Sequence, residues 1–142
     1  MRGVADSARP GRGGGSEGSR GPDPGRRRTA QRHGRRAEWI AAWMLRLKGY
    51  RILGRDIRTP VGEIDLLARR GKLVIVVEVK SRADPTDLPL SVTRRQQLRI
   101  LRATEYLRAS GRLGQDVEGI RFDVVTLSGH RWPKHLPDMW RP

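Results

Sequence analysis

Asp65, Glu78 and Lys80 are the residues of this sequence whose types and spacing are best suited to chemistry. Glu78 and Lys80 stand two positions apart near the end of the run Leu-Val-Ile-Val-Val-Glu-Val-Lys, and residues two apart on a strand share a face. A Glu-x-Lys pair alone is more often a surface ion pair. At the end of so apolar a strand, however, two charges are costly to bury without a further partner.

Asp65 lies on the preceding expected strand, and the register of the hairpin decides how it faces Glu78. A turn on Gly71-Lys72 places Asp65 directly opposite Glu78. A turn on Arg70-Gly71 instead places it diagonal to Glu78. Both registers put the two carboxylates on one face of the sheet, with about 4.5 to 8 Å between side-chain origins.

Two carboxylates at that separation repel each other unless a cation neutralises them. Mg²⁺ is typically held by one or two carboxylates and keeps several waters. A water whose pKa is lowered in this way can attack a phosphodiester. Lys80 would orient that water or stabilise charge on the phosphate. The pattern therefore predicts a catalytic site of Asp65, Glu78 and Lys80 that uses Mg²⁺ or Mn²⁺.

Glu38 is a further candidate for this site. It directly precedes Trp39 at the start of the first expected helix, so it flanks the expected buried face and could lean over the sheet toward the same cation. The alternative is a solvated glutamate in the first helical turn, where a negative charge interacts favourably with the helix dipole. The sequence leaves both interpretations open.

The elements that must position these residues follow the order α-β-β-β-α-β, which predicts an α/β fold with a mixed central sheet flanked by helices. Helices are expected from residue 37 to Gly49, which ends the first, and over residues 91–110, with Gly111 after the second. Strands are expected over residues 50–57, 62–69, 72–80 and 120–127. The third expected strand, residues 72–80, is apolar on both faces and should be central in the sheet. The first helix is expected to bury a stripe that comprises Trp39, Ile40, Trp43, Met44 and Leu47.

The two ends of the chain are expected to be irregular. Residues 1–36 are rich in Gly and Arg and are predicted to form a disordered basic arm, which either contacts phosphates or is a dispensable extension. The folded domain is expected to span residues 37–142, with an irregular tail from about residue 128 that contains Pro133 and Pro137. In that tail, Trp132 and Trp140 either stack on bases or pack on the body.

The charge of the chain indicates a polyanionic partner. The formal net charge is +15, from 30 basic and 15 acidic residues, and cysteine is absent. Arginines at i, i+4 and i+7 of the second expected helix share a face, as phosphate contacts would require. The candidate nucleic-acid-binding residues are Arg82, Arg94, Arg95, Arg99 and Arg102. No apolar run is long enough to cross a membrane, and we expect a cytoplasmic protein.

Two segments are distinctive as a pair: Gly-Glu-Ile-Asp-Leu-Leu-Ala at residues 62–68 and Val-Glu-Val-Lys-Ser-Arg at residues 77–82. They resemble the YraN-like family of small bacterial proteins of uncertain function, and the likeness extends over about residues 34 to 140. The resemblance implies a restriction-endonuclease-like fold similar to Holliday-junction resolvases, with Asp65, Glu78 and Lys80 at the metal-dependent nuclease motif. It also implies the backbone carbonyl of Val79 as an extra metal ligand. Gln96 stands where we would expect lysine.

These observations lead to one expected function and two alternatives. We expect a metal-dependent endonuclease that acts on DNA, branched or single-stranded. The alternatives are a non-catalytic nucleic-acid-binding module and an adaptor that recruits other proteins to DNA, both retaining the nuclease fold. A four-way junction as substrate would suggest a homodimer, because the substrate has two-fold symmetry.

Overall fold

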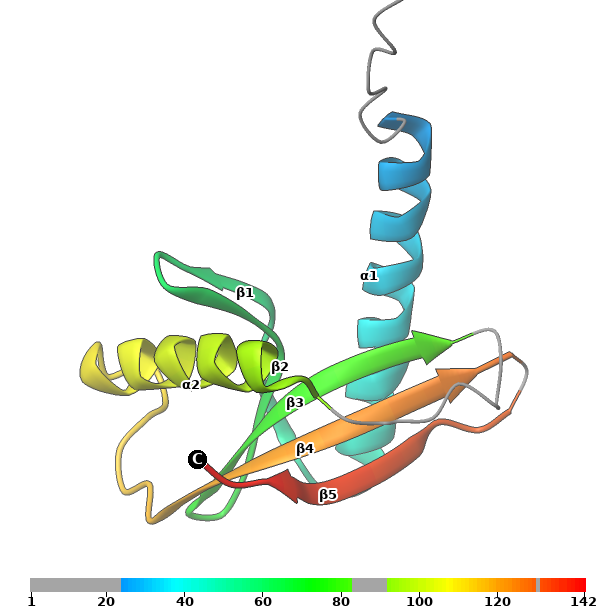
Figure 1. Ribbon diagram of the computed structural model, residues 1–142. Coiled ribbons are helices and arrows are strands. Elements are labelled where there is room, and N and C mark those ends of the chain that lie inside the picture. Colours follow the sequence, from blue (N-terminus) through cyan, green and yellow to red (C-terminus); the bar gives the residue numbers. More distant parts are fainter. Residues whose placement is uncertain (1–23, 83–91, 130) are drawn as a thin grey trace, which may run out of the picture.

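The strands form one mixed sheet with a helix against each face (Figure 1). The structure is a computed structural model that describes residues 24–82, 92–129 and 131–142. The elements are α1 (Pro24–Leu47), β1 (Arg51–Thr59), β2 (Gly62–Arg70), β3 (Leu73–Arg82), α2 (Arg94–Ala109), β4 (Gly119–Ser128) and β5 (Lys134–Trp140). The sheet order is β1-β2-β3-β4-β5, and only the β3–β4 pair is parallel. The expected α/β fold with a mixed sheet flanked by helices is confirmed.

β3 occupies the centre of the sheet, as its apolar sequence predicts. Val74 and Val76 belong to the core beneath α2, whereas Ile75 and Val77 belong to the core beneath α1. This alternation follows from the two-residue period of a strand. A strand buried on both faces holds its end in a fixed position, and that end carries Glu78 and Lys80.

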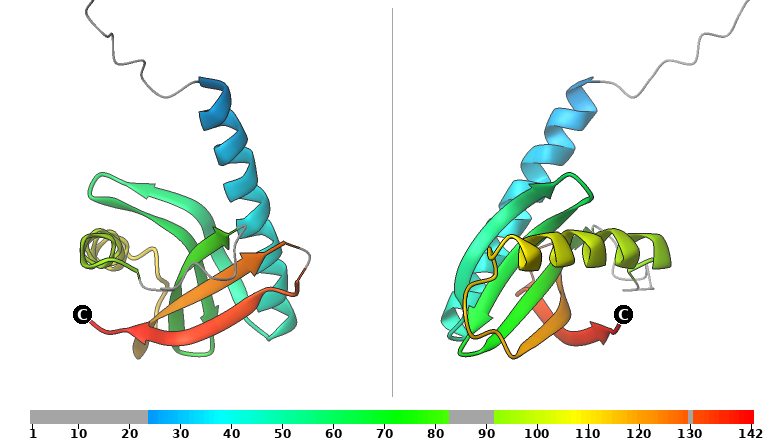
Figure 2. Two further views of the ribbon diagram at one scale, coloured as in Figure 1. Left: turned by 45° about the vertical axis from the view of Figure 1, so that its right-hand side comes forward. Right: turned by 90° about the vertical axis from the view of Figure 1, so that its left-hand side faces the viewer.

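The β1–β2 hairpin leaves the plane of the sheet and curls toward α2 (Figure 2). β2 pairs with β3 only from Leu66 to Arg70, while its first half pairs with β1 alone. The hairpin tip touches α2 at Gly62, where a Cβ would lie 2.4 Å from the carbonyl oxygen of Arg99, so this contact requires glycine. The curl also changes the expected alternation, because Ile64 joins the core beneath α2. The two strands therefore separate at Asp65.

The buried face of α1 differs from the expected stripe. Trp39, Trp43 and Leu47 are 52%, 47% and 73% exposed, and the side chains that pack on the sheet are mainly Ala41, Ala42, Met44 and Leu45. Small residues at the contact let the helix approach the sheet closely. Of the predicted stripe, Met44 is buried and Ile40 is partly buried, whereas the other three residues lie on the exposed face of the helix.

The structure corrects the predicted boundary between the N-terminal arm and the first helix. α1 begins at Pro24, so residues 24–36 are helical where an irregular arm was predicted; residues 1–23 lie outside the described part. Proline is favoured in the first turn of a helix, and most of the residues that follow are adequate helix formers. This part of α1 extends past the sheet (Figure 1), so it has no apolar periodicity that a sequence could reveal.

The predicted irregular tail contains a strand, β5, on the edge of the sheet beside β4. Pro137 is compatible with this position because an edge strand needs hydrogen bonds on one side only. The register shifts between the Phe122 and Val124 pairs, and Asp138 within this irregularity has φ of 55°. Of the two alternatives for the tail tryptophans, Trp140 packs on the body against Phe122, with ring centroids 4.0 Å apart. Trp132 is 74% exposed.

The second helix is shorter than expected at its start. α2 begins at Arg94 rather than at Ser91, which lies outside the described residues. Thr93 caps the helix by accepting a hydrogen bond from the Gln96 N–H, and the Gln96 side chain accepts one from the Thr93 N–H. Gly111 follows the last turn with φ of 73°, as predicted for a helix end. This cap fixes Gln96 and the next turn of α2 above the site.

Candidate active site

Asp65 and Glu78 lie at the point where β2 and β3 separate. The paired residues Leu66–Val77 and Arg70–Leu73 show that the hairpin turns on Gly71-Lys72. Of the two registers that the sequence left open, this is the one that places Asp65 opposite Glu78. Both side chains line one cleft, and the Asp65 charge raises the pKa of Glu78, so the two carboxyls lie close together. The face shared by the two carboxylates is therefore as predicted.

Val79 presents its backbone to Asp65 at the same point. The Val79 N–H donates a hydrogen bond of 2.8 Å to Oδ2 of Asp65. The N–H and C=O of one strand residue point to the same edge, so the Val79 carbonyl is also directed toward β2, beyond the last β2–β3 pair at Val77. This carbonyl is thus placed where the extra ligand was expected.

Lys80 shares a face with Glu78, as their spacing predicts. Lys80 Nζ lies 3.5 Å from Oε1 of Glu78, and the two side chains are only 17% and 16% exposed. Burial, and after it the Asp65 charge, raise the pKa of Glu78 and Lys80 lowers it, which leaves the pKa at about 7. Burial also raises the pKa of Asp65, against the effect of the Val79 hydrogen bond. One ammonium therefore does not neutralise both carboxylates.

Glu38 of α1 is close enough to Asp65 for the two charges to interact. Burial raises the pKa of Glu38 to about 7, and the charges of Asp65 and Asp56 contribute to the increase. A solvated glutamate in a first helical turn would not behave in this way, and Glu38 in fact lies well inside α1, which begins at Pro24. The structure thus favours the interpretation in which Glu38 leans toward the acidic pair.

Sequence reasoning missed Asp56 on β1. The β1–β2 register pairs Arg55 with Leu66 and Ile57 with Ile64, which puts Asp56 opposite Asp65. Asp56 has φ of 46°, a left-handed conformation that aspartate tolerates better than most residues. Its charge raises the pKa of both Asp65 and Glu38. Only the hairpin register reveals this residue, and no local motif does.

A cleft of about 160 Å³ gives access to the acidic pair. Its walls come from β2, β3 and the first two turns of α2, and it is lined by Glu63, Asp65, Glu78, Gln96, Arg99 and Ile100. Glu63 and Gln96 were not predicted as site residues. The Gln96 side chain is held by the Thr93 cap, so the position where lysine was expected carries a fixed neutral amide.

The structure separates the predicted arginines into groups. Arg99 lines the cleft, and Arg95 and Arg102 are exposed on the same face of α2 by helical spacing. Arg94 lines a different, smaller pocket of about 50 Å³ beside Leu98 and Trp140. Arg82 ends β3, but its side chain lies outside the described part of the chain. Arg95, Arg99 and Arg102 therefore form a basic edge beside the acidic pair.

The available oxygen ligands suit a hard cation that needs few protein ligands and completes its coordination with water. Among the side chains described, those of residues 34–81, 92–129 and 131–142, no three acidic or histidine side chains converge as a complete protein cage. The available ligands are the carboxylates of Asp65 and Glu78 and the carbonyl of Val79. Mg²⁺ and Mn²⁺ prefer oxygen ligands, and Mg²⁺ usually keeps several waters beside one or two carboxylates. The residues present therefore fit such an ion.

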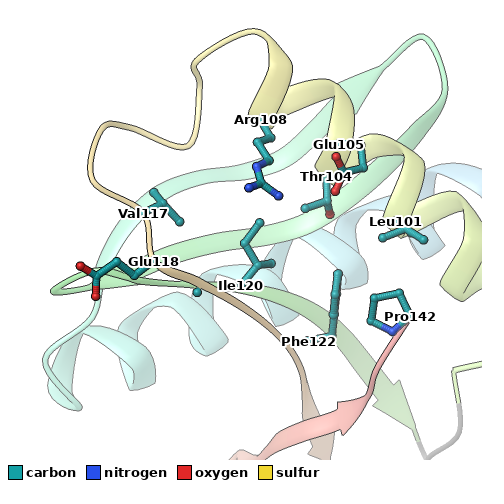
Figure 3. A pocket seen from close by; sticks show the side chains of 10 residues that line it. Leu101, Thr104, Glu105, Arg108, Val117, Glu118, Ile120, Phe122 and Pro142 are labelled. Carbon is teal, nitrogen blue, oxygen red and sulfur yellow. The ribbon is translucent and has the colours of Figure 1, made fainter.

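A larger cavity of about 210 Å³ lies on α2 away from the acidic pair (Figure 3). Its apolar lining comprises Ile120 and Phe122 of β4 and Leu101 of α2, and Arg108 also points into it from α2. The described carboxyls with a raised pKa, those of Glu38, Asp65 and Glu78, do not line it. We therefore place the candidate chemistry in the smaller cleft, where the charged groups converge.

Comparisons with known proteins identify a family and several bacterial relatives of this chain. Residues 37–127 match the model of "Uncharacterised protein family UPF0102". The chain is 46% identical to a UPF0102 protein of Parvibaculum lavamentivorans over 80% of this chain and 85% of the relative. It is 45% identical to one of Sphingopyxis alaskensis over 82% and 98%, respectively. The YraN-like resemblance is thereby confirmed. Among the described helices, none has the length and apolar character needed to traverse a bilayer.

Proposed function

The chain belongs to the UPF0102 family, and we propose that it is a metal-dependent phosphodiesterase that cleaves nucleic acid, most simply DNA. The observation that carries the proposal is that Asp65 and Glu78, each one position beyond the last β2–β3 pair, line one cleft beside the ammonium of Lys80. A structural ion pair has no need of a second, repelling carboxylate. In a site that binds a divalent cation, a second carboxylate has a role, because the cation offsets the repulsion between the two.

Each residue has a role that follows from its place. Asp65, Glu78 and the Val79 carbonyl would hold the cation, and a bound cation would supply positive charge to a phosphate and lower the pKa of a water. Lys80 points from the same face as Glu78, so its ammonium can hold the attacking water or the charged phosphate. Glu38 supports the acidic side of the cleft.

The basic edge of α2 supports nucleic acid as the substrate. Arg95, Arg99 and Arg102 follow one face of the helix beside the cleft. Arginine binds phosphate through a planar fork with two donors. A row of such groups leads a phosphate backbone toward the acidic pair. The net charge of +15 favours the same partner.

Cleavage with and without a cation tests the proposal. Purified protein in Mn²⁺ or Mg²⁺ is expected to cut at least one DNA among four-way junctions, flaps and single strands. Chelation by EDTA should abolish the cut, because Asp65 and Glu78 act through the cation. The measurement is the appearance of product on a denaturing gel.

Two variants guard this assay against a contaminating nuclease. Glu78→Gln is expected to be inactive, while Glu105→Gln, an exposed glutamate of α2 outside the cleft, should remain active. If no substrate is cut with either cation although DNA is bound, the non-catalytic binding module replaces the nuclease as the function.

A further inference from the structure

α1 carries an exposed surface of aromatic and basic residues that the proposed cleavage site does not use. Trp39 and Trp43 are about half exposed and meet edge to face, with ring centroids 6.0 Å apart. The Arg46 guanidinium carbon lies 5.4 Å from the centroid of the Trp43 ring. Large aromatic side chains with this exposure are uncommon on a surface that has no partner.

Helical geometry shows what surrounds the two rings. Positions 35, 36, 39, 43 and 46 fall on one side of a helix that turns about 100° per residue. Arg35, Arg36 and Arg46 are all exposed there, and in the stretch 34–47 this side has no acidic residue. Glu38, the acidic residue of α1, lies about 100° around the helix from Trp39, and the charges of Asp65 and Asp56 act on it. We call the exposed side formed by Arg35, Arg36, Trp39, Trp43 and Arg46 the tryptophan face.

We propose that the tryptophan face of α1 binds unpaired bases of a nucleic acid whose backbone is held by the flanking arginines. Aromatic rings that alternate with basic groups are the combination by which proteins hold single strands, since every base has a face that can stack. The inference rests on the proposed function, and it names the substrate class: a nucleic acid with a single-stranded segment next to the point of cleavage.

The position of the face agrees with this role. Glu38 interacts with Asp65, and Trp39 is the next residue of α1, so the tryptophan face begins about 100° around the helix from the acidic pair. A strand that leaves the cleft past Glu38 and continues around α1 would reach this face, which lies on the side of the helix away from the sheet. The basic edge of α2 lines the cleft from the other side.

Charge disfavours a second copy of this chain as the occupant. Two tryptophan faces packed together would bring three arginines of each copy into contact, and of these Arg35 alone has an acidic neighbour within residues 34–47, Glu38. Like charges that meet at an interface are costly. A polyanion gains from the same arginines, and release of its counterions adds to the gain.

Binding in EDTA tests this inference separately from cleavage. A short fluorescent single-stranded oligodeoxynucleotide and its duplex are titrated with protein, and anisotropy gives both dissociation constants. Trp39→Ala/Trp43→Ala is expected to weaken single-strand binding by about tenfold or more and to leave duplex binding nearly unchanged. Trp39→Phe/Trp43→Phe should retain most of the affinity, because stacking survives.

Matched variants make each outcome decisive. Trp132→Ala removes a more exposed tryptophan between β4 and β5 and should not alter single-strand affinity. Asp65→Asn should still bind the single strand in EDTA, so a cleavage site that fails leaves this inference intact. Unchanged single-strand affinity in the double alanine variant would overturn it. An equal loss of single-strand affinity in Trp132→Ala would also overturn it. So would sedimentation that shows the wild type as a dimer and the double alanine variant as a monomer.

Discussion

Replacing Lys80 with alanine is expected to lower the rate of Mn²⁺-dependent cleavage by about 10²- to 10³-fold, the loss typical when one preorganised charge-stabilising group is removed. Lys80 is 17% exposed and lies 3.5 Å from Glu78, so solvent cannot easily replace its ammonium. Cation binding should survive, because the ligands are carboxylates and a carbonyl. Single-turnover cleavage with saturating protein measures the chemical step.

Lys72→Ala is the matched control for this experiment. Lys72 directly precedes β3 and forms an exposed ion pair with Glu118, away from the cleft. We expect wild-type cleavage from this variant, because exposed ion pairs contribute little. A Lys80→Ala protein that cleaves at the wild-type rate would show that Lys80 is only the electrostatic partner of Glu78.

Replacing Asp123 with alanine is expected to cost about 3 kcal/mol of unfolding free energy or more, because it leaves buried partners without their counter-charge. The Asp123 side chain is fully buried on β4. It accepts two hydrogen bonds of 2.8 Å from Arg121, one of 3.0 Å from the Asp138 N–H, and one from His135 at 2.8 Å. Urea unfolding near neutral pH measures the loss.

The pH dependence of that loss has a definite sign. Burial alone would raise the pKa of Asp123, but the hydrogen bonds from Arg121, His135 and Asp138 outweigh it and lower the pKa to about 2. The stabilisation is therefore complete above the ordinary value of 3.8 and disappears as the pH falls through about 2. Wild type and Asp123→Ala should converge in that range.

Asp116→Asn is the control for stability. Asp116 is exposed and has φ of 57°, a conformation that asparagine also adopts readily, so its stability should match wild type. An Asp123→Ala protein as stable as Asp116→Asn would mean that β5 is held only by its backbone hydrogen bonds to β4 and by the stacking of Trp140 on Phe122.

The sequence predicted the parts of the fold that have strong periodicity. β3 was identified as central because it is apolar on both faces. The two-residue spacing of Glu78 and Lys80 predicted that their side chains share a face of this strand. The hairpin turn limited Asp65 to one face in either register. These features depend on local spacing, so one sequence is sufficient to find them.

The sequence did not predict features that depend on distant packing. Tryptophans 39 and 43 were expected to be buried because they are large, but alanines 41 and 42 allow α1 to approach the sheet and take the contact. β5 escaped prediction because Pro137 is tolerated only at an edge, and edges are known only from the sheet order. Asp56 joined the site through cross-strand register, which no segment encodes alone.

A titration of Mn²⁺ by calorimetry tests most directly whether Asp65 and Glu78 share one cation. Wild type is expected to bind one equivalent, more tightly at about pH 8 than at about pH 6, because the cation competes with protons that these carboxyls retain. Asp65→Asn should lose this binding and Asp116→Asn should keep it. Equal Mn²⁺ affinity in wild type and Asp65→Asn would contradict the shared site.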